Sequence, residues 1–135
     1  MRYTVLIDGS KGAYGVVVPD LPGCTAMGAT IEAALVNAVA AMRDWAEVTE
    51  DAGGAVPAPR DPEAVSADEE VREALAEGAM LASAPMVRVT GRPAKANMSL
   101  DSGILAAIDA EASRQKLTRS AFVEWMARRV LTEVA

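Results

Sequence analysis

The stretch KANMSL, residues 95–100, alternates polar and apolar side chains without interruption. Alternation with a period of two is typical of a β-strand that buries one face and exposes the other. The polar positions are Lys95, Asn97 and Ser99, and the apolar positions are Ala96, Met98 and Leu100. Nothing else in this tail reads as a strand, so its backbone N–H and C=O groups need a partner from outside. We therefore expect the same strand of a second copy to pair with it, which predicts an obligate homodimer.

Two helices are predicted after this strand. Asp101 can cap a helix over residues 102–115, and Thr118 can cap a second one that reaches about residue 133. Both segments carry apolar residues at helical spacing, namely Ile104, Leu105, Ile108, Ala112, Phe122, Val123, Met126 and Val130. A unit this small buries too little apolar surface to be stable alone, which again favours intertwined dimerisation.

A paired two-stranded ribbon has the width of the DNA major groove, and this suggests what the polar face of the strand does. We expect base-edge contacts from Lys95, Asn97 and Ser99. The free N–H groups at the start of the second helix predict a phosphate anchor formed with Thr118, Arg119 and Ser120. The alternative is a dimer seam that contacts no DNA.

The charge of the chain is unevenly divided. Residues 1–90 hold 6 basic and 14 acidic residues, a net charge of −8, whereas residues 91–135 hold 7 basic and 5 acidic ones, a net charge of +2. An acidic front half favours a basic partner, and a basic tail favours phosphate. The alternative for the front half is an acidic surface that is merely solvated.

The front half predicts an α+β fold. Residues 2–8 and 13–18 flank a glycine-containing turn and read as a hairpin, and residues 24–28 add a third strand after a proline-rich loop. The meander is followed by a helix that Thr30 caps and that ends near residue 50. Its predicted core stripe is Ile31, Leu35, Val39, Met42 and Trp45, with alanines beside it that would let the helix lie close to a sheet.

The middle of the chain is rich in proline and in acidic residues. A segment with three prolines predicts an irregular loop that passes into a short helix over residues 69–77. A fourth strand is expected within residues 78–90, with Met86, Val87 and Val89 as its apolar part. Residues 91–94 are the hinge, so we predict two domains, 1–91 and 92–135.

Composition excludes several kinds of chemistry. The chain of 135 residues has no histidine and one cysteine, Cys24, which argues against zinc sites and Cys/His nucleophiles and predicts a packed thiol. The acids Asp8, Asp20, Glu32 and Asp44 follow no pattern that would gather them into a metal site. We predict no enzyme activity, no cofactor and no metal. No membrane span or leader pattern is present, and a cytoplasmic protein is expected.

One group of residues in the front half resembles the HicB antitoxin family. It consists of Tyr14-Gly15 in a strand, the loop PDLPGC at residues 19–24, Gly28, a helix opened by Thr30, and VPAP at residues 56–59. The family's front domain has a partial RNase-H-like fold, and one branch ends in a ribbon-helix-helix domain. The tail, with its Asp-capped helix and a Leu-Thr-Arg-Ser helix start, is similar to ribbon-helix-helix repressors. Lys116 departs from that pattern, because glycine is common at this helix end.

The resemblance implies an antitoxin that neutralises a HicA-type mRNA-cleaving toxin and represses its own operon by binding operator DNA. It implies a homodimer through the C-terminal ribbon, or a tetramer built from two such dimers. The sequence does not identify the residues that contact the toxin, and Asp20, which we expect to be exposed in its proline-flanked loop, is a candidate. The alternatives are a ribbon-helix-helix repressor whose front domain senses something other than a toxin, and a minimal nuclease.

Overall fold

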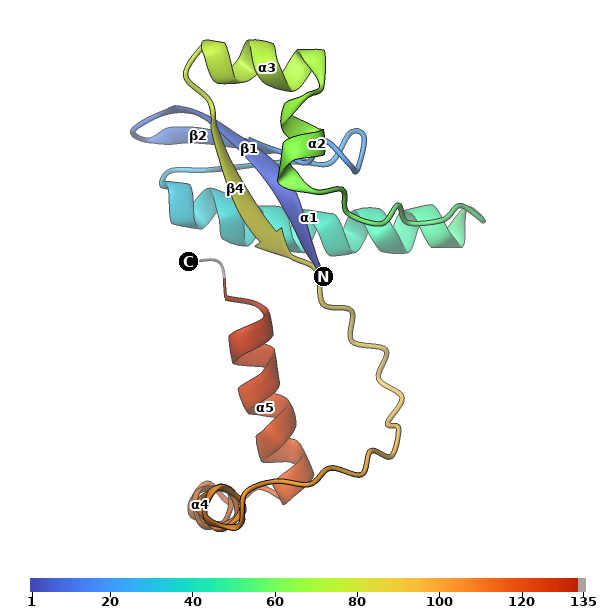
Figure 1. The fold of residues 1–135 in the computed structure, drawn as a ribbon, viewed down its shortest axis with the longest axis vertical. Helices are drawn as coiled ribbons and strands as arrows, with labels where there is room; N and C mark the ends of the chain where they lie inside the picture. Colours follow the sequence, from blue (N-terminus) through green and yellow to red (C-terminus); the bar gives the residue numbers. More distant parts are fainter. Residues whose placement is uncertain (134–135) are drawn as a thin grey trace. The chain divides into compact units, whose positions relative to one another are not determined.

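The structure, a computed structural model, describes residues 1–133 and divides into two units, residues 1–88 and residues 89–133. The first unit contains β1 (Arg2–Ser10), β2 (Ala13–Val17), β3 (Thr25–Gly28), α1 (Ile31–Asp51), α2 (Pro62–Ser66), α3 (Glu69–Ala76) and β4 (Met80–Pro85) (Figure 1). The second contains α4 (Ser102–Arg114) and α5 (Arg119–Leu131). The first unit is an α+β fold, as predicted, and none of the helices described is long and apolar enough to cross a membrane.

The four strands form one antiparallel sheet in the order β3-β2-β1-β4. The predicted three-stranded meander is confirmed. The fourth strand differs from the prediction, since β4 covers 80–85 and ends before Val87 and Val89. The reason lies in β1, which begins with Arg2 opposite Pro85, so that residues beyond Pro85 have no ladder to join. Two hydrogen bonds between Met1 and Met86 extend the pairing: the Met86 N–H donates to the Met1 carbonyl at 2.7 Å, and the amino terminus of Met1 donates to the Met86 carbonyl at 3.3 Å.

α1 covers the inner face of the sheet and builds the main core with Tyr3, Val5 and Ile7 of β1. Its Thr30 cap is confirmed, because the Thr30 hydroxyl accepts a bond from the Ala33 N–H. The buried residues of α1 are Ala34, Leu35, Ala38, Met42 and Ala46, so the alanines take a larger share of the interface than predicted. The small side chains let the helix approach β3 so closely that a Cβ on Gly28 would lie 2.4 Å from the Ala34 nitrogen.

α2 and α3 lie over the outer face of the sheet. Leu6 lies between the inward-facing residues Val5 and Ile7 of β1, so its side chain is on the outer face, where it packs against Val65 of α2 and Val71 of α3. α3 confirms the short helix predicted at 69–77, whereas α2 lies in a stretch predicted to be irregular. Pro62 in the first turn and Glu63 beside it are ordinary helix-start signals.

The second unit contains the two predicted helices with their predicted caps. The Asp101 carboxylate accepts bonds from two backbone N–H groups, and the Thr118 hydroxyl accepts one from the Ala121 N–H. α4 ends in a Schellman turn, with the Leu117 N–H bound to the Ala112 carbonyl at 2.9 Å. Lys116 occupies the left-handed position of this turn, with φ of +58°.

The stretch 95–100 forms no strand within one chain, and all six of its residues are exposed. Met98, on the face predicted to be buried, is 65% exposed. Among the residues described in this unit, the only buried apolar ones are Ala112 and Phe122. One copy of the tail therefore leaves most of its apolar side chains uncovered.

Candidate functional site

The proline-rich loop at residues 19–24 is held tightly at the end of β2. The Val18 N–H donates to the Cys24 carbonyl at 3.1 Å, and the Cys24 N–H donates to the Leu21 carbonyl at 2.9 Å. Cys24 is packed in the core, as predicted, and burial raises the pKa of its thiol. The Trp45 indole N–H of α1 binds the Pro22 carbonyl at 2.9 Å, which fixes the loop to the helix.

Asp20 is not the exposed residue that the sequence led us to expect. Its side chain is only 4% exposed, and both carboxylate oxygens accept bonds from Arg60. The Arg60 backbone N–H lies 2.8 Å from one oxygen and the Arg60 Nε lies 2.6 Å from the other. A carboxylate buried in a loop needs such compensation for its lost hydration, and an arginine that follows a proline-rich segment provides it.

Arg60 also reaches α3, which makes it the centre of a three-part clamp. Its two terminal nitrogens bind the two oxygens of Asp68, the N-cap of α3, at 3.1 and 2.8 Å. These bonds lower the pKa of Asp68, and the bonds to Asp68 and then Asp20 raise the pKa of Arg60. The proline-rich stretch that leads to Arg60 is also held, because the hydroxyl of the buried Tyr3 donates to the Pro57 carbonyl at 2.5 Å. The clamp therefore fixes the start of α3 relative to the sheet.

The clamp borders a groove between α3 and the outer face of the sheet, which we call the outer groove. It encloses about 580 Å³ and is lined by Leu6, Asp8, Val17, Pro19, Asp68, Glu69, Glu70, Val71, Ala74 and Ala79. Four of these residues are acidic and none is basic, and the others are apolar. The outer groove thus combines an apolar floor with a negatively charged rim.

The floor of the outer groove continues onto bare sheet. Leu6 pairs with Val17 and Asp8 pairs with Gly15, so these four residues share the outer face. Met27 pairs with Gly15 and extends that face onto β3. Val17 is 43% exposed and Met27 is 67% exposed, because α2 and α3 cover only the part of the sheet near Leu6.

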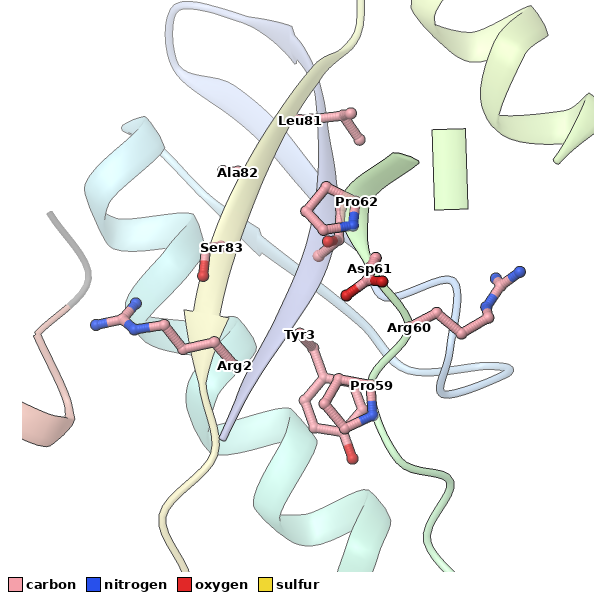
Figure 2. A pocket seen from close by; sticks show the side chains of 10 residues that line it. Arg2, Tyr3, Pro59, Arg60, Asp61, Pro62, Leu81, Ala82 and Ser83 are labelled. Carbon is pink, nitrogen blue, oxygen red and sulfur yellow. The ribbon is translucent and has the colours of Figure 1, made fainter. Parts of the chain in front are cut away.

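A second hollow of about 530 Å³ lies beside β4, the edge strand of the sheet, and is lined by residues 2–4, 59–62 and 81–83 (Figure 2). Figure 2 shows that the Arg60 side chain is directed away from this hollow. It binds the carboxylates of Asp20 and Asp68 instead. Asp61 serves as the N-cap of α2. We assign no binding role to this hollow, because Arg60, one of its two arginines, is already bound to two carboxylates outside it.

The residues predicted to contact DNA fall into two groups in the second unit. Lys95, Asn97 and Ser99 are exposed on the segment that precedes α4. Thr118, Arg119 and Ser120 lie at the start of α5, where the first N–H groups have no intrahelical carbonyl to bind. The two groups belong to the same unit of the chain.

Arg119 has a partner that the sequence did not indicate. Its Nε and one terminal nitrogen bind the two oxygens of Asp109 in α4, each at 2.8 Å. This bidentate pair lowers the pKa of Asp109 and raises that of Arg119. The guanidinium that we expect to meet phosphate is therefore held by a carboxylate in the unbound chain.

No cluster of three or more histidine, cysteine, aspartate or glutamate side chains that could hold a metal ion occurs within residues 1–133. Sequence reasoning missed the role of Arg60 and the rim formed by Glu69 and Glu70. The acidic composition of residues 61–77 was visible, but only the fold places it beside the sheet.

Comparison with known proteins gives consistent matches. A family model described as the HicB-like antitoxin of bacterial toxin-antitoxin systems matches residues 3–127. The crystal structure of the Burkholderia pseudomallei antitoxin HicB is 27% identical, with 97% of this chain and 96% of that chain covered and a TM-score of 0.51. A chain from the HicA3 and HicB3 toxin-antitoxin complex is 26% identical, with 65% of this chain and 100% of that chain covered and a TM-score of 0.55. A search of curated proteins found no match.

Proposed function

Because the chain belongs to the HicB-like antitoxin family, we propose that it binds and neutralises a HicA-type toxin and represses the operon that encodes the pair. The observation that carries the toxin half is the likeness of the chain to a member of the HicA3 and HicB3 complex, together with the net charge of −8 on residues 1–90. A toxin that cleaves mRNA must bind a polyanion, so its active face is expected to be basic and to attract an acidic antitoxin. We place this activity in the cytoplasm, where the mRNA is.

The division of labour that we propose follows domains 1–91 and 92–135. The first, a partial RNase-H-like domain without catalytic function of its own, binds the toxin. The second, a ribbon-helix-helix domain, binds operator DNA. The acidic first part and the basic second part suit these two partners.

The exposed stretch at residues 95–100 supports the second half of the proposal, because it is suited to dimerisation. Within residues 1–133 of one chain this stretch pairs with no strand, and Met98, Leu100 and Ile104 are all exposed. Pairing with the same stretch of a second copy would satisfy the backbone groups and cover these side chains at once. The result is a two-stranded ribbon flanked by four helices, from which tetramers can form through the front domains.

On the ribbon, the polar set Lys95, Asn97 and Ser99 would face the base edges, and Thr118, Arg119 and Ser120 would bind phosphates beside the groove. The Asn97 amide is suited to bidentate pairing with adenine. On DNA binding, Arg119 would exchange the Asp109 carboxylate for a phosphate, since each of these anions offers two oxygens to the N–H groups of the guanidinium.

Toxin neutralisation is tested by co-expression with the short basic reading frame expected beside the gene. We expect the chain to restore growth arrested by that toxin and to co-purify with it in a catalytically inactive form. A chain that binds operator DNA but neither rescues growth nor binds the toxin would instead be a ribbon-helix-helix repressor with a different sensing role.

DNA readout is tested with three variants, using operator and random-sequence affinities at several salt concentrations. Asn97→Ala should lose about 1–3 kcal/mol on the operator and little on random DNA. Arg119→Ala should weaken both and reduce the salt slope by about one unit for each phosphate that is no longer bound. Met98→Lys is the control that should prevent the dimer. Equal losses on both DNAs for Asn97→Ala would refute base readout by the strand.

A further inference from the structure

We propose that the outer groove is the surface on which the chain binds its toxin, and that the toxin inserts a basic side chain with apolar neighbours into it. The inference rests on the proposed antitoxin function and specifies where and how the partner is recognised. Three observations support it: the distribution of charge, the exposed apolar floor, and, within residues 1–133, the absence of bonding partners for most acids of the rim.

The charge of the front half is concentrated beside the outer groove. Residues 61–77, which include α2 and α3, contain seven acidic residues and one basic residue, a net charge of 1 − 7 = −6. Residues 1–90 as a whole carry −8, so everything else in that part contributes only −2. The field that would steer a basic protein is therefore strongest on the outer layer of the fold.

The floor of the outer groove offers apolar surface that the chain does not cover itself. Val17 and Met27 lie on the outer face of β2 and β3, where the register places them on the same side as Leu6. Both side chains are exposed, whereas their neighbours on the inner face are covered by α1. A patch of this kind beside charged groups is typical of a protein-binding surface, in which an apolar centre is surrounded by a polar rim.

The rim of the outer groove contains four acidic residues, one of which is bound to an arginine of the same chain. Asp68 is held by Arg60, which anchors the start of α3. No ion pair or hydrogen bond to the side chains of Asp8, Glu69 or Glu70 is present among the residues that the structure describes. These acids stay hydrated until a cation arrives, and the clamp holds the helix that presents two of them.

The combination of floor and rim suits arginine or lysine from a protein better than a small cation. The long aliphatic stem of such a residue can pack on Val17 and Ala74 while its charged end meets the carboxylates of Asp8 and Glu70. Apolar neighbours on the partner would then cover Met27. A basic protein can pack an aliphatic stem on the floor, place a cation against the carboxylates and cover Met27, whereas a free ion can only meet the carboxylates.

The test measures association and dissociation rates of the full chain with a surface-bound, catalytically inactive form of the adjacent toxin, at low and physiological salt. The rim variant is Glu69→Gln with Glu70→Gln. Its matched control is Glu73→Gln with Glu77→Gln, which removes the same charge from the same helix region at residues that do not line the outer groove. The floor variant is Val17→Lys, at an exposed position of β2.

We expect the rim variant to slow association about tenfold at low salt and the control to slow it less than about twofold, because charges nearest the docking site dominate the on-rate. Val17→Lys should raise the dissociation rate at least tenfold with an unchanged circular dichroism spectrum. Equal rates for rim and control variants, or a tightly bound Val17→Lys chain, would overturn the assignment of the surface while leaving the antitoxin function intact. Failure of the unaltered chain to bind would instead refute the proposed function.

Discussion

Replacing Lys116 by glycine should stabilise the second unit. Lys116 has φ of +58° and sits in the Schellman turn between α4 and α5, where its N–H binds the Ser113 carbonyl at 3.1 Å. The left-handed backbone costs a residue with a Cβ about 1–2 kcal/mol. Glycine avoids this cost, but its greater freedom in the unfolded chain offsets about 0.4–1 kcal/mol. The expected net gain is about 0.5–1 kcal/mol.

Amide hydrogen exchange of α4 and α5 in the full chain measures this gain, at a fixed protein concentration because dimerisation would contribute to stability. Protection should rise about two- to fivefold, since 1.4 kcal/mol corresponds to a factor of ten. Lys116→Ala, which keeps the strained backbone and removes the side chain, should match the unaltered chain. Ser113→Gly, in right-handed helical backbone, should lower protection by a similar factor. Unchanged or lower protection in Lys116→Gly would refute the strain argument.

Three further predictions concern packing, DNA affinity and pH. Gly28→Ala should destabilise the front unit by at least about 2 kcal/mol in urea unfolding, because its Cβ would lie 2.4 Å from the Ala34 nitrogen; wild-type stability would show that α1 can shift freely. Asp109→Asn should tighten binding to operator and random DNA alike in anisotropy titrations, since it releases Arg119 from a competing carboxylate; unchanged affinity would mean that Arg119 does not meet phosphate. Hydrogen bonds from Arg114 and Gln115 lower the pKa of Glu111 from 4.5 to about 2. The ionised Glu111 side chain should therefore stabilise the fold above about pH 4.5, and this contribution should be lost as the pH falls toward 2. A carboxyl NMR titration of Glu111 with a midpoint near 4.5 would contradict this.

The candidate site was predictable only in part. The acidic composition of residues 61–77 and the alternation of β1 were visible in the sequence. The alternation alone indicates that Leu6 and Asp8 share a face. It does not indicate that α3 lies beside them, because that depends on how Arg60 bridges two acids far apart in the chain. Asp20 was wrongly expected to be exposed for the same reason, since its loop was visible in the sequence but its distant partner Arg60 was not.

Local signals determined most of the elements in this chain. Caps at Thr30, Asp101 and Thr118, and the periodicity of the segments that follow them, are properties of neighbouring residues, so the sequence by itself was sufficient to place those helices. The left-handed turn at Lys116 is likewise set by the helix that it ends.

Only the tertiary structure decided where β4 ends, which residues of α1 are buried, and where the acids of the outer layer lie. β4 ends where its partner β1 begins, which no pattern within residues 78–90 records. The alanines of α1 are buried because Gly28 lets the helix backbone approach β3. In each case the deciding contact joins residues distant in sequence, and its free energy exists only once the sheet and helices are packed together.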